Sequence, residues 1–153
     1  MRVLKFGGTS VGSVESIKNV KKIVEACEEP AIVVVSALGG ITDKLIDTAR
    51  LAGVGNNDYL ECFEYICERH HHIIEGVVDK DKKEDVLKIV DSLLDELGNI
   101  FRGVYLIKDL SNKTLDAIVS YGERISSIIV SQVINKAIHY DSRQFIKTNI
   151  QFN

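Results

Sequence analysis

The chain alternates short β-branched runs with longer stretches in which apolar residues recur every three or four positions. This helical spacing predicts a first helix over about 13–29, which ends before Pro30. An apolar strand at 3–6 precedes the helix. The β-branched run 31–35 follows it and is typical of a strand buried on both faces of a parallel sheet. Strand, helix and strand in this order predict a right-handed crossover unit of an α/β protein.

The middle of the chain has the pattern of two long helices. After a loop at 53–57, apolar residues keep steps of three and four on both sides of the charged segment 79–85. We expect this segment to reverse the chain, which gives an antiparallel helical hairpin over about 57–110 with a coiled-coil-like seam. A last helix is expected over 114–138, and a third strand near Phe145.

Composition narrows the class of protein. The 153 residues are 45% hydrophobic and 27% charged, which indicates one globular unit with a core of its own. The net charge of −3 argues against nucleic acid or an anionic membrane as a partner, because both need a basic excess. No apolar run approaches the roughly 20 residues of a membrane span, so we expect a cytoplasmic protein. Three cysteines within helical patterns lack C-x-x-C spacing and are expected to be reduced: Cys27, Cys62 and Cys67.

A glycine-rich turn between the first strand and the first helix is the strongest candidate for chemistry. Glycines let the backbone approach an oxyanion, and a following helix directs unpaired N–H groups and its positive dipole end to the same point. Lys5 adds a full positive charge just before the turn. The pattern predicts a phosphate-binding site, although a purely structural glycine turn is the alternative. The turn reads Gly7, Gly8, Thr9, Ser10, Val11 and Gly12.

A second glycine turn follows the strand at 31–35. Ligands of open α/β sheets bind at the carboxyl ends of the strands, so both turns are expected to face one crevice. Ser36, Thr42 and the N–H groups near Gly39 and Gly40 are candidates to bind phosphate or carboxylate oxygens there. For Thr42, capping of the next helix is an equally good interpretation.

Glu123 is expected beside the buried face of the last helix, among small and apolar neighbours. A carboxylate in such surroundings needs a cationic partner, which is either a ligand ammonium or an ordinary ion pair with Arg124. No metal site is expected, because consecutive residues of a helix point in different directions and cannot converge on one ion. This excludes the adjacent histidines His70, His71 and His72.

Three motifs follow one another along the chain: Lys5-Phe6-Gly7-Gly8-Thr9-Ser10-Val11-Gly12, then Val34-Val35-Ser36-Ala37 with Thr42-Asp43-Lys44-Leu45, then Ser120-Tyr121-Gly122-Glu123-Arg124. In this order they resemble the N-terminal part of an aspartokinase, within the amino-acid-kinase family. The segment 141–149 also resembles the third core strand of that family, so the similarity covers the whole chain. The resemblance implies a partial three-layer α/β/α sandwich with a mainly parallel sheet, into which the helical hairpin is inserted.

The resemblance also implies a reaction. The γ-phosphoryl group of ATP passes to the side-chain carboxylate of L-aspartate and gives 4-phospho-L-aspartate, at the entry to lysine, threonine and methionine synthesis. By the same resemblance, Lys5 would stabilise the transferring phosphoryl oxygens, and Glu123 would hold the substrate ammonium. Ser36 and Thr42 would approach the aspartate or the transferring group. Mg²⁺ accompanies the nucleotide without a protein cage of its own. The residues lining the ATP phosphates are Gly7, Gly8, Thr9 and Ser10.

The chain lacks segments that the family places further on, including its nucleotide-binding half and its regulatory domains. We therefore expect residues 1–153 to be a catalytically incomplete N-terminal portion of the kinase domain. With only three strands, it should expose apolar sheet surface and form a homo-oligomer or be marginally stable. Two other functions stay open: a non-enzymatic association module that acts through the hairpin, and another amino-acid kinase.

Overall fold

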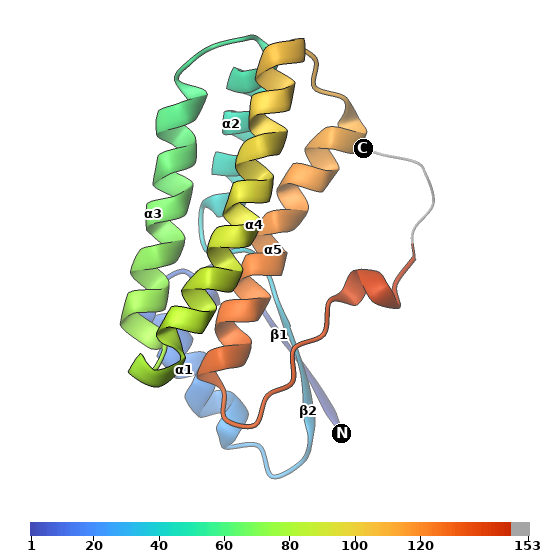
Figure 1. Cartoon of the computed structure of the whole chain (residues 1–153). Helices are drawn as coiled ribbons and strands as arrows, with labels where there is room; N and C mark the ends of the chain where they lie inside the picture. The colour runs from blue at the N-terminus through green and yellow to red at the C-terminus, as the bar shows by residue number, and fades with distance from the viewer. Residues whose placement is uncertain (148–153) are drawn as a thin grey trace.

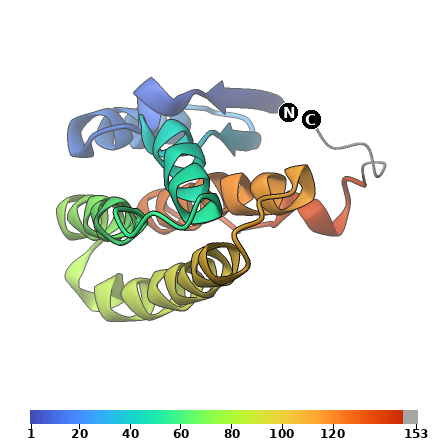
Figure 2. The same ribbon diagram turned by 90° about the horizontal axis from the view of Figure 1, so that it is seen from above.

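A computed structural model describes residues 1–147 of the chain. Long helices dominate it, and a two-stranded sheet lies to one side (Figure 1). Seen from above, the sheet and α1 lie at one side of the molecule and α4 at the other (Figure 2). The elements are β1 (Arg2–Phe6), the 3-10 helix η1 (Gly8–Val11), α1 (Val14–Glu25), β2 (Ala31–Val35), α2 (Ile41–Gly53), α3 (Tyr59–Val77), α4 (Lys80–Ile107), α5 (Asn112–Val133) and the 3-10 helix η2 (Ser142–Gln144).

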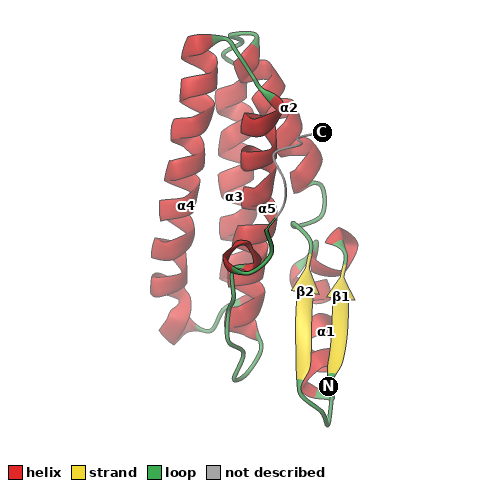
Figure 3. Ribbon diagram, turned by 90° about the vertical axis from the view of Figure 1, so that its right-hand side faces the viewer, coloured by secondary structure: helices red, strands yellow, loops and turns green. Residues whose placement is uncertain are grey.

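The two strands are parallel and are joined through α1, as the order of the pattern predicts (Figure 3). Phe6, Val33 and Val35 face the core. On the other face, Ile32 and Val34 are 49% and 45% exposed. The prediction that the run 31–35 is buried on both faces is therefore wrong, because the helices of the described residues cover only one side of the sheet.

Helix α1 begins at a capping box. The Ser13 hydroxyl accepts a hydrogen bond from Ser16 N–H, and the Ser16 hydroxyl accepts one from Ser13 N–H. The helix ends at Glu25 rather than at 29. Ala26 N–H already points to two carbonyls, which tightens the last turn, and residue 29 precedes Pro30 and is biased away from helical backbone angles.

The helical hairpin is formed by α3 and α4, with Val78 and Asp79 as the connection. The expectation that the whole charged segment 79–85 reverses the chain is wrong, because residues 80–85 are already helical. Lys83 Nζ binds the Glu75 carboxylate at 2.7 Å across the turn. The seam is apolar, and Phe63 meets Phe101 edge to face with ring centroids 5.6 Å apart.

The last helix, α5, runs over 112–133 instead of 114–138, and Ser111 caps it by accepting a hydrogen bond from Thr114 N–H. The prediction of a third strand near Phe145 is wrong within the described residues, which contain no strand there. Asp141 instead binds both the N–H and the guanidinium of Arg143, and these local contacts hold a 3-10 turn. Residues 148 and 149 of that expected strand lie outside the described residues.

Residues that the structure describes include no helix with the length and apolar content needed to cross a membrane.

Candidate active site

The two glycine turns lie in direct backbone contact. A Cβ placed on Gly12 would lie 2.9 Å from the Gly8 carbonyl oxygen and 3.4 Å from Gly39 Cα. A Cβ on Gly39 would lie 3.1 Å from the same Gly8 oxygen. Only glycine fits where two backbones approach this closely. The turns that follow β1 and β2 therefore share one end of the sheet, as the strand order predicts.

The first turn has one open side. Gly7 has an extended backbone, and a Cβ added there would meet no atom within 4 Å. Ser10 N–H donates to the Gly7 carbonyl at 2.9 Å, which closes the single turn of η1. The N–H groups of Gly8 and Thr9 precede this bond and lie at the unpaired start of the 3-10 helix.

The first turn itself contains a short helix, η1, which the sequence pattern does not predict between β1 and α1. At the start of α1 the Ser16 N–H is already bound by the Ser13 hydroxyl at 3.1 Å. Lys5 is an exposed residue of β1, in register with Val34 on the uncovered face of the sheet. Within residues 1–147, Lys5 makes no ion pair.

The second turn is tied to the end of β1. Ser36 N–H donates to the Phe6 carbonyl at 3.0 Å, and Ile41 N–H donates to the Leu38 carbonyl at 2.9 Å. Gly40 is the N-cap of α2 and has a φ of 81°, a left-handed conformation that favours glycine. Thr42 lies one residue inside the helix, so the interpretation of Thr42 as the cap is wrong. Ser36 and Thr42 are both half-buried.

Glu123 comes to this turn from α5. Its Oε1 accepts a hydrogen bond from Ala37 N–H at 3.4 Å. The neighbouring Gly122 allows the approach, because a Cβ there would lie only 2.7 Å from Ala37 Cβ. A half-buried carboxylate is thus placed against the residue that follows Ser36.

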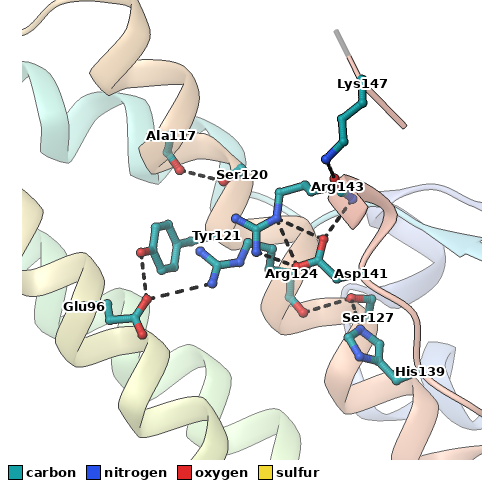
Figure 4. Close-up of polar contacts among 10 residues, drawn as sticks. All are labelled: Glu96, Ala117, Ser120, Tyr121, Arg124, Ser127, His139, Asp141, Arg143 and Lys147. Carbon is teal, nitrogen blue, oxygen red and sulfur yellow. Dashed lines mark hydrogen bonds and ion pairs between the residues drawn. The ribbon is translucent and has the colours of Figure 1, made fainter. Parts of the chain in front are cut away.

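Arg124 has its partners on another side of α5. Its guanidinium stacks over the Tyr121 ring at 4.1 Å, and Nη2 lies 3.9 Å from Glu96 Oε2 on α4 (Figure 4). The Tyr121 hydroxyl also donates to this carboxylate, at 3.1 Å. Among the described residues, the ion pair of Arg124 is therefore with Glu96 and not with Glu123. This leaves the Glu123 carboxylate without a cationic partner within residues 1–147.

Sequence reasoning missed one contact at the first turn. The Nη2 atom of Arg69, on α3, donates a hydrogen bond to the carbonyl oxygen of Gly12, which lies 57 positions earlier in the sequence. No spacing rule connects the two residues, because the contact depends on how the hairpin packs against α1. His70, the residue that follows this arginine, is 1% exposed, which agrees with its place in the apolar pattern of the hairpin.

The histidines do not share a ligand. His70 Nδ1 bonds to the Ile66 carbonyl at 2.7 Å, and burial lowers the pKa of His70 to about 4. His71 Nε2 lies 2.6 Å from Asp91 Oδ1, and His72 is exposed. Over residues 1–147, no three side chains of the metal-binding types gather around one point. Burial and nearby aspartates raise the pKa of Cys67 to about 11, which keeps it a thiol.

A large concavity lies beside the glycine turns rather than at them. It is an open trough of about 2240 Å³ between β2, α4, α5 and the segment 134–146. Glu123 and Arg124 line one wall, whereas the first glycine turn does not contribute. The candidate site therefore lies where the two turns meet. The trough borders this site only at Glu123.

Comparison with known proteins agrees with this architecture. The model of the amino acid kinase family matches residues 1–152. The chain belongs to the amino acid kinase family.

Within that family, the chain is similar to aspartokinases. It is 32% identical to aspartokinase 1 of Arabidopsis thaliana over 96% of its own length, and 33% identical to the aspartokinase of Chlamydia trachomatis over 98%. It spans 26% and 32% of the lengths of these two relatives.

Solved structures show the same likeness. Aspartokinase III of E. coli in complex with lysine and aspartate matches with a TM-score of 0.87 and 25% identity, over 99% of this chain and 34% of that one. The same enzyme in complex with aspartate and ADP matches with a TM-score of 0.77 and 26% identity, over 87% and 28%. The chain therefore has part of the α/β fold of an aspartokinase, and the predicted fold class is confirmed.

Proposed function

We propose that residues 1–153 are the N-terminal portion of the catalytic domain of an aspartokinase. The observation that carries the proposal is the contact between the two glycine turns, with the Glu123 carboxylate held against the second one. In this proposal, the backbone donors of the first turn bind phosphate, and the Glu123 carboxylate accepts an ammonium group at the same end of the sheet. The similarity to aspartokinases over most of the chain supports it.

The first turn is the proposed site for the ATP phosphates. Its open side at Gly7 leaves space for an oxyanion, and the N–H groups of Gly8 and Thr9 lie at the start of η1. The Ser10 hydroxyl adds a donor beside them. Lys5 is the last residue but one of β1, the strand that leads into the turn, and its ammonium has no competing ion pair among the described residues. Lys5 stabilises the charge on the transferring phosphoryl oxygens.

The second turn is the proposed site for L-aspartate. Glu123 receives its ammonium group, which gives the half-buried carboxylate the cation it lacks. Ser36 and Thr42 have hydroxyls at either end of the same turn, and they bind carboxylate oxygens of the substrate. The substrate is then held by its ammonium and by oxygen atoms, which fixes the direction of its side chain.

The phosphoryl transfer depends more on the positioning of the two substrates than on acid–base catalysis. A side-chain carboxylate oxygen of aspartate forms a bond to the γ-phosphorus while the bond from that phosphorus to the bridging oxygen of ADP breaks. The nucleophile is already ionised, so no general base is required. Mg²⁺ bound with the nucleotide would neutralise part of the charge of the phosphates.

The chain spans only 26% and 32% of the lengths of two related aspartokinases, and we propose that the nucleotide-binding half of the kinase domain lies in the remainder. We therefore expect the isolated chain to form little or no aspartyl phosphate. An assay of ATP-dependent aspartyl phosphate formation, trapped with hydroxylamine, tests this. Turnover near that of an intact aspartokinase would contradict the proposal that the chain is an incomplete domain.

The aspartate half of the proposal is tested by calorimetric titration of the chain with L-aspartate. Glu123→Gln should abolish measurable binding, because the neutral amide cannot pair with the ammonium. Glu61→Gln, an exposed change at the start of α3, is the matched control and should leave the affinity unchanged. Equal affinity in the Glu123→Gln variant and the unmodified chain would contradict the role of Glu123.

A further inference from the structure

Arg69 reaches from the helical hairpin to the edge of the candidate site. Its guanidinium donates to the carbonyl oxygen of Gly12, the last residue of the first glycine turn. A guanidinium gives a charge-assisted hydrogen bond, which is stronger than a bond between neutral groups. Among residues 1–147, no carboxylate forms an ion pair with Arg69. The Arg69 guanidinium therefore binds the turn and not a neighbouring carboxylate.

Gly12 lies at the contact between the two turns. Its N–H donates to the Thr9 carbonyl at 3.4 Å, and its Cα side packs against Gly8 and Gly39 with no space for a side chain. Its carbonyl is bound by Arg69. Thus the N–H and the carbonyl of Gly12 are both hydrogen-bonded, and its Cα is closely packed. The bond to the carbonyl comes from a residue of the hairpin.

The helix that presents Arg69 is itself held against α1. Gly76 of α3 lies so close to the Val14 side chain that any Cβ there would clash with it. His70, the next residue after Arg69, is buried. The position of Arg69 therefore follows the packing of α3 on the start of α1, immediately after the first turn.

We propose that Arg69 is a positioning residue that fixes the first glycine turn in the shape that binds phosphate. This inference rests on the proposed function, because it assigns to the hairpin a part in holding the phosphate site. Arg69 acts through the Gly12 peptide and does not touch the substrate. The hairpin then supports the site directly, in addition to packing against the core.

The first arm of the test needs no ligand. Amide hydrogen exchange is compared in the unmodified chain, in Arg69→Ala and in Arg69→Lys. The Ala variant should exchange faster across residues 8–14, while protection in α4 and α5 is retained. The Lys variant keeps one charged donor and should recover most of the protection. Arg102→Ala removes an exposed arginine of the same hairpin and should change nothing at the turn.

The second arm measures binding of Mg-ATP and of L-aspartate by the same variants. Arg69→Ala should weaken Mg-ATP by about tenfold and leave aspartate within about twofold, because the aspartate residues lie on the second turn and α5. A general loss of structure would weaken both ligands together, and this result would overturn the positioning role.

The two arms separate the inference from the proposed function. If the unmodified chain binds no Mg-ATP, the proposed phosphate site fails in this chain, and hydrogen exchange alone decides whether Arg69 fixes the turn. Unchanged exchange over residues 8–14 in Arg69→Ala overturns the inference, whatever the ligand data. Faster exchange confined to that segment, with recovery in Arg69→Lys, supports it.

Discussion

At the scale of single residues, His70 makes the fold sensitive to acid. The side chain is buried within α3, and its Nδ1 must carry the proton because it bonds to the Ile66 carbonyl. Nε2 is buried and has no hydrogen-bond partner among the described residues. Burial therefore penalises the doubly protonated ring and lowers the pKa to about 4, well below its ordinary value of 6.5.

The sign of the effect follows from linkage. The unfolded chain takes up the proton at a higher pH than the folded chain, so the free energy of unfolding falls as the pH drops from about 6.5 toward 4. The loss should approach about 3 kcal/mol, since one pKa unit corresponds to about 1.4 kcal/mol. Urea unfolding at several pH values measures it. His70→Leu should flatten the dependence, whereas a change at the exposed His72 should not.

Gly12 gives a second prediction at this scale. An alanine side chain there would meet the Gly8 carbonyl oxygen at 2.9 Å, a backbone atom that cannot move aside without shifting the turn. Gly12→Ala should lower the free energy of unfolding by about 1–3 kcal/mol. Gly7→Ala, where a Cβ meets nothing within 4 Å, should cost much less. Equal losses in the two variants, measured by urea unfolding, would mean that the turns are not in close contact.

At the scale of elements, the packing of α5 on the second turn sets the place of Glu123. A Cβ on Gly122 would lie 2.7 Å from Ala37 Cβ and 3.3 Å from Leu45 Cδ1. Gly122→Ala should therefore push α5 away from the turn, destabilise the fold by about 1–3 kcal/mol and weaken the contact of Glu123 with Ala37.

The matched control for this variant is Gly103→Ala in α4. A Cβ there meets no atom within 4 Å, and alanine has the better helix propensity, so the change should stabilise by about 0.5–1 kcal/mol. Thermal unfolding compares the two variants. If both changes raised the melting temperature, the close approach of α5 to the second turn would be excluded.

The elements also show what the sequence can and cannot predict. The order of strand, glycine turn and helix places both turns at one end of the sheet, and the structure has them in contact at Gly8, Gly12 and Gly39. A β-strand, however, forms only where a neighbouring strand pairs with it, and the sequence of one segment does not show whether such a strand is present. Phe145 lies in a strand-like sequence but is 65% exposed within the described residues, where a local bond network around Asp141 forms instead.

The contact between Arg69 and Gly12 marks a different limit. A helical pattern identifies α3 and its buried side, but it does not tell which distant carbonyl an arginine of that helix will reach. The contact depends on the angle at which α3 crosses α1, and that angle follows from packing details such as Gly76 against Val14. Sequence periodicity does not contain this information.

At the scale of the whole molecule, the uncovered face of the sheet is the main consequence of its two strands. Val3, Ile32 and Val34 are 66%, 49% and 45% exposed. Parallel strands usually have both faces covered. We therefore expect the isolated chain to self-associate through this face as its concentration rises.

Sedimentation velocity over a range of concentrations tests this expectation. Ile32→Lys should shift the chain toward the monomer, because a charge on the uncovered face opposes its burial against another copy. Ile107→Lys changes a similarly exposed apolar residue at the far end of α4 and should leave the association unchanged. An unmodified chain that stays monomeric at all concentrations would contradict the expectation.

The proposed function requires that the first glycine turn, together with Lys5, binds the phosphates of ATP. Calorimetric titration of the folded chain with Mg-ATP, beside a Lys5→Ala variant, measures this binding. We expect measurable affinity in the unmodified chain and an affinity at least about tenfold weaker in the variant, since a full positive charge at the phosphates is lost. Binding that is equal in the two proteins, or absent from a chain shown to be folded, would contradict it.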